Sequence, residues 1–212
     1  MSLLDDVDAL IDSRRLLDHP FYTKWVSGTL PKEAIQEYCR QYFAFESSFP
    51  RFLSAIHSRT EDPTARQHLL ENLWDEERGA ENHRELWLRF AEGMGVARED
   101  VENAGRNEAT RALVDTYTSA CEDPSAGVAA VHAYERQVPA VAAAKIAGLG
   151  EHYGIDDDRT LAFWKVHEGL DVEHADAERE ILDASDRDRV FDGTRRALDA
   201  WWAFLDAVDA PA

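Results

Sequence analysis

Helical spacing of apolar residues recurs along the whole chain, and no segment shows the polar–apolar alternation of a β-strand. We therefore expect an all-α fold, a bundle of about seven helices. No repeat or low-complexity linker divides the 212 residues, so residues 1–212 should form a single domain. The segments expected to be helical are 3–17, 21–28, 32–58, 63–92, 106–121, 124–149, 157–184 and 188–209.

Two prolines lie inside these helices. Pro50 leaves the carbonyl of Glu46 without its donor, and Pro139 does the same to Glu135, so each helix should bend there. The helix around Pro50 is rich in tyrosine and phenylalanine, which predicts a buried aromatic wall. A bend beside Glu135 could orient its carboxylate as a ligand, although such bends as often result from packing alone.

The acidic composition narrows the choice of partners. The net charge is −19, and only four of the 23 basic residues are lysines. Such a chain repels phosphate backbones, so we expect no nucleic-acid partner, and its lysine-poor surface is typical of a halophilic protein. It has no apolar run long enough for a membrane span and no recognisable signal peptide. Two isolated cysteines, Cys39 and Cys121, fit a reducing compartment, so we expect a cytoplasmic protein.

Residues 167–174 read His-x-x-x-Asp-x-x-His within the helix expected over 157–184. At ~100° per residue, Asp171 and His174 each lie within about 40° of the direction of His167. Two imidazoles and a carboxylate on one helix face suit a first-row transition metal. In a chain this acidic, the same three residues would also fit a solvated polar face.

Two other helices carry residues that could complete a metal site. Glu76 and His83 are seven positions apart, two turns along one helix face, and Glu135 precedes the bend at Pro139. With the three residues above they give three carboxylates and three imidazoles, a set suited to two adjacent irons in a helical bundle. The spacing differs from the paired Glu-x-x-His of ferritin-like proteins. Neighbouring acidic residues leave open that Glu76 is only surface charge.

Several motifs resemble those of the CADD-type proteins, which are haem-oxygenase-like dimetal oxidases, and the likeness covers nearly the whole chain. It implies a seven-helix haem-oxygenase-like fold, shared with the TenA thiaminases and the pyrroloquinoline-quinone synthase PqqC. It also implies that all six residues above are metal ligands: Glu76, His83, Glu135, His167, Asp171 and His174. The matching segments are His19-Pro-Phe-Tyr22-x-x-Trp25, Phe49-Pro-Arg-Phe-Leu-Ser-Ala-Ile-His57-Ser, Glu71-Asn-Leu-x-Asp-Glu76-Glu, Asn82-His83-x-Glu-Leu-Trp87, Tyr134-Glu135-x-Gln-Val-Pro139, Lys145-Ile-x-Gly-Leu149 and the motif at 167–174.

The resemblance further implies an activity, the O2-dependent formation of p-aminobenzoate for folate-type cofactors. It would require two iron ions (Fe/Fe or Fe/Mn) and an external reductant. The ring would come from the protein's own Tyr22, with Lys145 as amino donor, while Tyr38 and Tyr134 match further tyrosines near the site. Relatives with the same ligands oxidise free amino acids or fatty acids, so a separate small-molecule substrate stays open. The family habit and an exposed Trp201-Trp202 pair favour a homodimer.

The surroundings of Lys145 and Tyr22 allow two interpretations each. Lys145 lies among apolar residues ten positions after Glu135, about 80° from its direction. A buried lysine has a depressed pKa and is a competent amine nucleophile, whereas the alternative is a lysine that reaches the surface. Tyr22 could equally be an aromatic wedge beside Phe21 and Trp25.

Other function classes remain open at this stage. A TenA-like thiaminase needs a nucleophilic cysteine facing its substrate, and neither cysteine fits that pattern. A metal-free PqqC-like enzyme would leave the Glu/His/Asp set without a purpose, and a regulatory or binding module would not need six convergent ligands. A metal-storage bundle would bind iron but form no O2-dependent product.

Overall fold

The computed structural model describes residues 2–209, except for the side chains of residues 169–173. Within this range the chain is all-α, as the sequence predicts, with twelve α-helices and one 3-10 helix. Their bounds are α1 (Leu3–Asp12), η1 (Leu16–Asp18), α2 (Pro20–Val26), α3 (Lys32–Glu46), α4 (Phe49–Arg59), α5 (Pro63–Glu77), α6 (His83–Gly93), α7 (Arg98–Glu102), α8 (Glu108–Ala120), α9 (Pro124–Glu135), α10 (Val138–Tyr153), α11 (Asp158–Asp183) and α12 (Arg187–Asp209).

The predicted number of helices, about seven, was wrong because three predicted helices are each divided in two and because the short helix α7 was not predicted. Pro50 and Pro139 lie in the first turns of α4 and α10, where the missing N–H of proline has no helical partner to lose. The expected bends are therefore complete breaks. Residues 78–82 separate α5 from α6, and Asn82 caps α6 by accepting the N–H of Glu85.

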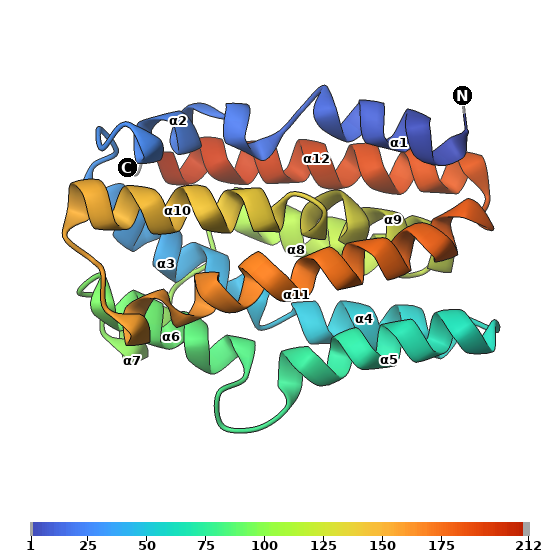
Figure 1. Ribbon diagram of the computed structural model, residues 1–212, viewed down its shortest axis with the longest axis horizontal. Helices are drawn as coiled ribbons and strands as arrows, with labels where there is room; N and C mark the ends of the chain where they lie inside the picture. The colour runs from blue at the N-terminus through green and yellow to red at the C-terminus, as the bar shows by residue number, and fades with distance from the viewer. Residues whose placement is uncertain (1, 210–212) are drawn as a thin grey trace.

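Helix α11 crosses one face of the molecule obliquely (Figure 1). Helix α11 packs against α10, α6, α9 and α5, while α12 packs against α9, α8 and α1. Helices α4 and α5 form an antiparallel pair along one edge of the bundle. Helix α11 therefore contacts the three helices that carry the other candidate ligands, α5, α6 and α9.

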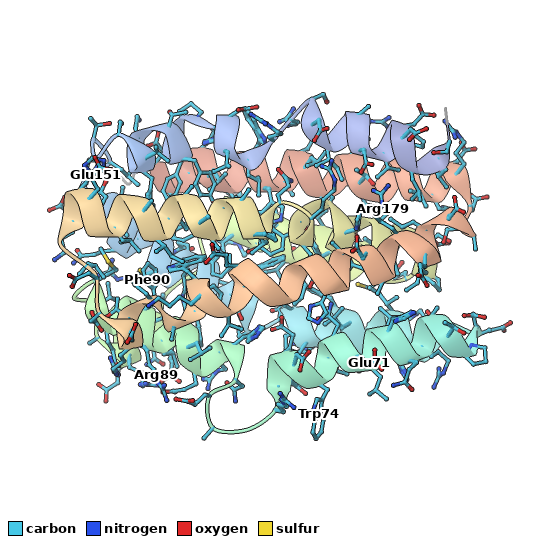
Figure 2. The ribbon with its side chains drawn as sticks, in the orientation of Figure 1. Glu71, Trp74, Arg89, Phe90, Glu151 and Arg179 are labelled. Atoms are coloured by element: carbon cyan, nitrogen blue, oxygen red, sulfur yellow. The ribbon has the colours of Figure 1, made fainter. Side chains whose placement is uncertain are left out.

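Helix α5 departs from the usual pattern, because it turns polar side chains toward the interior. On α5, Trp74 is 60% exposed and points away from the bundle (Figure 2), whereas Asn72 and Glu76 on the opposite face are buried. The predicted aromatic wall on α3 and α4 is confirmed, since its aromatic side chains are all buried: Tyr38, Tyr42, Phe43, Phe45, Phe49 and Phe52. Among residues 2–209, no helix combines the length and apolarity that crossing a membrane requires.

The expectation that both tryptophans at the end of the chain are exposed was wrong for Trp201, which is only 1% exposed. Its ring stacks on Tyr134 with centroids 4.5 Å apart, and its Nε1 donates to the hydroxyl of Tyr117. Trp202 is partly buried, and its Nε1 donates to the carbonyl of Arg14. Trp201 therefore belongs to the core, and a homodimer stays a prediction without its support.

Candidate metal centre

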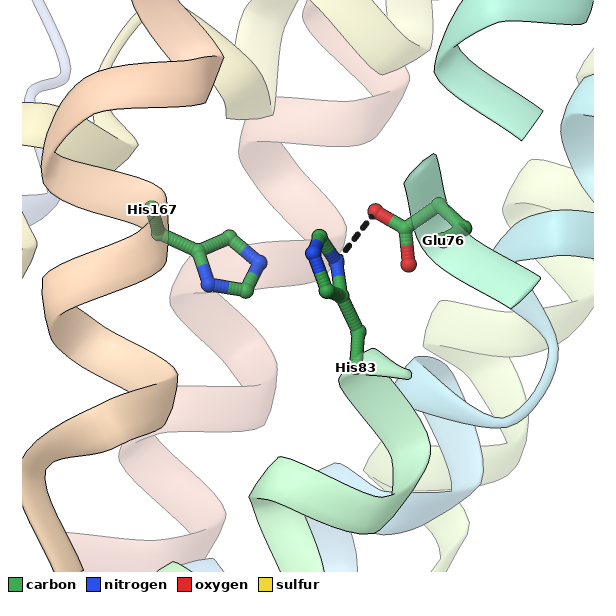
Figure 3. Close-up of side chains that lie close together, drawn as sticks. All are labelled: Glu76, His83 and His167. Carbon is green, nitrogen blue, oxygen red and sulfur yellow. Dashed lines mark ion pairs between the residues drawn. The ribbon is translucent and has the colours of Figure 1, made fainter. Parts of the chain in front are cut away.

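Three helices bring Glu76, His83 and His167 together in the interior (Figure 3). One ligand atom from each lies within 4.8 Å of the others, and all three side chains are buried. Oε1 of Glu76 is 2.9 Å from Nδ1 of His83, and the ring centroid of His83 is 4.4 Å from that of His167. Iron-type ions bind such atoms at about 2 Å, so two ligands of one ion lie at most about 4 Å apart, and the three atoms are close to that limit.

A hydrogen bond holds His167 in the form that binds metals. Its Nδ1 is 2.7 Å from the backbone carbonyl of Phe163, one turn earlier on α11. A carbonyl only accepts, so Nδ1 carries the proton and Nε2 keeps its lone pair for a metal. Burial and the neighbouring His83 lower the pKa of His167 well below its usual range, which keeps the ring neutral.

Glu76 and His83 form a buried ion pair. Burial alone would lower the pKa of His83, but the charge and hydrogen bond of Glu76, with Glu46 and Glu135 nearby, raise it to about 9. The imidazolium thus balances part of the negative charge around it. A metal ion bound here would take over that role by displacing the proton.

Glu135 ends α9 and is 2% exposed. The side-chain amide of Asn72 on α5 donates to both of its oxygens, at 3.0 and 3.1 Å. Burial raises the pKa of Glu135, and hydrogen bonds with Glu178 and Asn72 oppose that rise. Glu135 lines a small internal cavity together with Glu76 and His167, so its carboxylate faces the same space as they do.

The remaining two predicted ligands lie on α11. His174 is buried, and its Nε2 is 3.4 Å from Oδ2 of Asp75. It is close enough to Glu135 and His167 to influence the pKa of both. The side chain of Asp171 lies outside the described residues. Of the six predicted ligands, three therefore meet within 4.8 Å and two more lie beside them.

Two buried glutamates near the site were missed by the sequence analysis. Glu178 follows His167 by eleven residues, which places it about 20° from the direction of His167 on α11. Its Oε2 is 3.2 Å from Nδ1 of His132, and it is hydrogen-bonded to Glu135. Glu46 ends α3 and is 4% exposed; burial and the charge of Glu76 raise its pKa to about 8. Glu46 precedes Pro50 by four residues, as Glu135 precedes Pro139. A proline four positions later was therefore a sequence signal for both glutamates.

The donor set fits a bound cation on electrostatic grounds. Glu46, Glu76 and Glu135 lie at the ends of α3, α5 and α9, where the backbone carbonyls already concentrate partial negative charge. Buried carboxylates are costly unless paired, and His83 supplies one positive charge among them. A site with several buried carboxyl groups, offering oxygen and imidazole nitrogen ligands, is suited to iron or manganese.

Lys145 is completely buried, so the alternative of a surface lysine is wrong. Its Nζ donates to the hydroxyl of Tyr38 at 2.6 Å and lies 3.9 Å from the ring centroid of Trp164. The ring centroids of Tyr22 and Trp25 are 5.1 and 5.2 Å from the same nitrogen. Burial lowers the pKa of Lys145 well below its usual range, which favours a neutral amine with a free lone pair.

Tyrosines connect this lysine to the metal ligands. Tyr134 and Tyr42 line the internal cavity with Glu76, Glu135 and His167, and their hydroxyl oxygens are 2.5 Å apart. The ring centroid of Tyr42 is 5.3 Å from that of Tyr38, which is hydrogen-bonded to Tyr22. Tyr42 was predicted only as part of the aromatic wall, and the structure places it between the two sites.

Glu178 offers a first test of how the site is held together. Replacing Glu178 with glutamine should weaken metal binding by about 10- to 100-fold, because it alters the hydrogen bonds that orient Glu135. A chelator-competition titration with Mn²⁺ measures this change directly. Glu180→Gln is the matched control, since that side chain lies on the same helix and is 75% exposed. Equal affinities in the two variants would contradict a positioning role for Glu178.

Comparison with known proteins gives a consistent assignment. A family model described as iron-containing redox enzyme matches residues 36–202. The 4-aminobenzoate synthase of Chlamydia muridarum (strain MoPn / Nigg) is 42% identical over 100% of this chain and 92% of its own length. The 4-aminobenzoate synthase of Nitrosomonas europaea is 40% identical over 95% of this chain and 89% of its own length. The pyrroloquinoline-quinone synthase of Rhizobium meliloti is 31% identical over 90% of this chain and 78% of its own length.

Solved structures agree on the fold. A TenA homolog from Pseudomonas syringae superposes with a TM-score of 0.83 at 17% identity, covering 97% of this chain and 90% of its own. A CADD-like protein from Nostoc punctiforme gives a TM-score of 0.76 at 21% identity, covering 96% and 95%. These likenesses confirm the predicted haem-oxygenase-like, TenA-type fold. With the family model and the whole-length identity to the curated synthases, they show that the chain is an oxidoreductase of the 4-aminobenzoate synthase family of iron-containing redox enzymes.

Proposed function

We propose that this enzyme forms p-aminobenzoate, with the ring of Tyr22 as the carbon source and Lys145 as the amino donor. The observation that carries the proposal is the position of the Lys145 amine, buried and 5.1 Å from the ring centroid of Tyr22. The relatives at 40–42% identity are named for the synthesis of this product. The name of these relatives supports p-aminobenzoate as the product, and the contact between Lys145 and Tyr22 supports these two residues as its source.

Two metal ions, Fe/Fe or Fe/Mn, would be held by the six candidate ligands: Glu76, His83, Glu135, His167, Asp171 and His174. When bound, such ions would allow O2 to act as the oxidant, with electrons from an external reductant. The protein's part is to keep His167 neutral with its Nε2 available and to hold Glu135 in place through Asn72. The buried, oxidisable side chains of Tyr42 and Tyr38 lie between the metal ligands and Tyr22.

Burial favours an internal source over a separate substrate. Tyr22 is 2% exposed and Lys145 is fully buried, with Trp25 and Trp164 packed against the amine. A separate aromatic substrate would have to displace these rings to reach Lys145, and each buried aromatic side chain stabilises its packed position by roughly 1.5–3 kcal/mol. Tyr22 is already in place. The same packing excludes water from the amine and from the ring.

Isotope labelling tests the source of the ring. Protein containing ring-¹³C tyrosine is incubated with Fe²⁺, O2 and a reductant in unlabelled buffer, and p-aminobenzoate is analysed by mass spectrometry. Labelled product, with a matching mass loss at residue 22, is the expected result, and Tyr22→Phe should abolish it. Tyr153→Phe is the control, because that hydroxyl only donates to the carbonyl of Leu30. Unlabelled product would show that an external substrate is used.

A further inference from the structure

A pocket of about 210 Å³ opens beside the candidate metal centre. Its walls come from the end of α3, the start of α4, the end of α5 and the start of α6. Acidic and polar side chains dominate them: Glu46, Ser47, Glu76, Glu77, Asn82 and Arg84. We call this space the α3–α5 pocket. It lies at the helix breaks that also place Glu76 and His83.

The α3–α5 pocket adjoins the metal ligands through two shared side chains. Glu46 and Glu76 line both this pocket and the internal cavity that contains Glu135 and His167. Glu77, the next residue after Glu76, is exposed and marks the outer side of the pocket. A series of carboxylates, Glu77, Glu46 and Glu76, therefore runs from solvent to the buried cluster.

Glu46 is buried with only part of its carboxyl group hydrogen-bonded. Its Oε1 is buried and accepts no hydrogen bond within the described residues, while Tyr42 hydrogen-bonds the carboxylate. A buried polar atom left without a partner is costly and calls for a functional explanation. Arg84 does not neutralise it, because the guanidinium is paired with Glu102 at 2.7 Å.

We propose that the α3–α5 pocket is the loading port of the metal centre, where a hydrated divalent cation binds Glu46 before it reaches Glu76 and His83. Oxygen ligands of this kind bind divalent first-row ions, and negative charge in a confined space raises the local concentration of cations. About 15 Å³ of such space admits one water molecule, so 210 Å³ accommodates an ion with its hydration shell. The inference rests on the proposed dimetal site, and it adds the route by which that site fills.

The rate of metal binding tests this inference separately from catalysis. Metal-free protein is mixed anaerobically with Co²⁺ in a stopped-flow instrument, and the visible absorption of bound Co²⁺ is followed. Glu46→Gln keeps the shape of the side chain but cannot ionise to bind a cation. We expect binding to slow by about tenfold or more, with about two ions bound at the end as in the parent. Glu61→Gln is the control, because Glu61 lines a separate pocket of about 480 Å³.

The possible results divide clearly. An unchanged rate in Glu46→Gln, with two ions bound, overturns the loading port and leaves the proposed function intact. A final content of one ion instead of two also overturns it, since Glu46 would then be a resident ligand. A parent protein that binds no ion removes both proposals. If Glu46→Gln does not fold, Ser47→Trp narrows the same pocket from its wall, and slower binding with full final content supports the port whereas an unchanged rate overturns it.

Discussion

Replacing Lys145 with methionine should reduce p-aminobenzoate formation per chain by roughly a thousandfold or more, while metal content stays at the parent level. Methionine is unbranched and of similar length, so it fills the space among Trp25, Tyr38 and Trp164 with little change in packing. It has no nitrogen to transfer. The loss expected is therefore that of an essential nucleophile rather than of the fold.

The measurement is product per chain by mass spectrometry, alongside metal analysis and a thermal melt of the same samples. Lys165→Met is the matched control, because that lysine is exposed and pairs with Asp158 on the surface of α11. Parent-level product from Lys145→Met would contradict the role of this amine. The tyrosine ring would then require another nitrogen source.

Helical spacing predicted a shared face on α11, but the prediction that Glu76 and His83 share one helix was wrong, because residues 78–82 separate α5 from α6. Spacing also could not predict contacts between helices. The offsets of 4 and 7 marked His167, Asp171 and His174, and the offset of 11 to Glu178 carries the same information. Asn72 and Glu135 are 63 positions apart, and nothing in their local sequence indicates the hydrogen bonds between them. Such contacts depend on how the helices pack.

The prolines show a second limit of the sequence. Pro50 and Pro139 predicted disturbed helices, yet a lost hydrogen bond alone does not distinguish a bend from a complete break. The structure has breaks, and these place Glu46 and Glu135 at helix ends. The adjacent tryptophans show a third limit. Neighbouring residues on a helix point about 100° apart, so Trp201 lies in the core while Trp202 lies at its margin.

Adding Fe²⁺ or Mn²⁺ to metal-free protein should stabilise the fold strongly, and the variant His167→Ala combined with Glu76→Gln should lose that effect. An ion present at a hundred times its dissociation constant raises the free energy of unfolding by about 2.7 kcal/mol. For a chain of this size that raises the melting temperature by roughly 5–10 °C. The cause is the cluster of buried carboxyl groups, Glu46, Glu76 and Glu135, whose ionised form a bound cation stabilises.

The double variant separates this cause from nonspecific binding to an acidic surface. It removes one imidazole and one carboxylate charge from the cluster of three, while the net charge of the chain changes only from −19 to −18. His152→Ala is the control. His152 lies near the end of α10, and its Nε2 contacts the carbonyl of Val26 on α2 rather than the candidate ligands. We expect parent-like stabilisation in the control and almost none in the double variant, measured by calorimetry at matched ion concentration. A parent protein whose melting temperature responds to neither ion would contradict the dimetal site, because a cation that binds only the folded cluster must stabilise it.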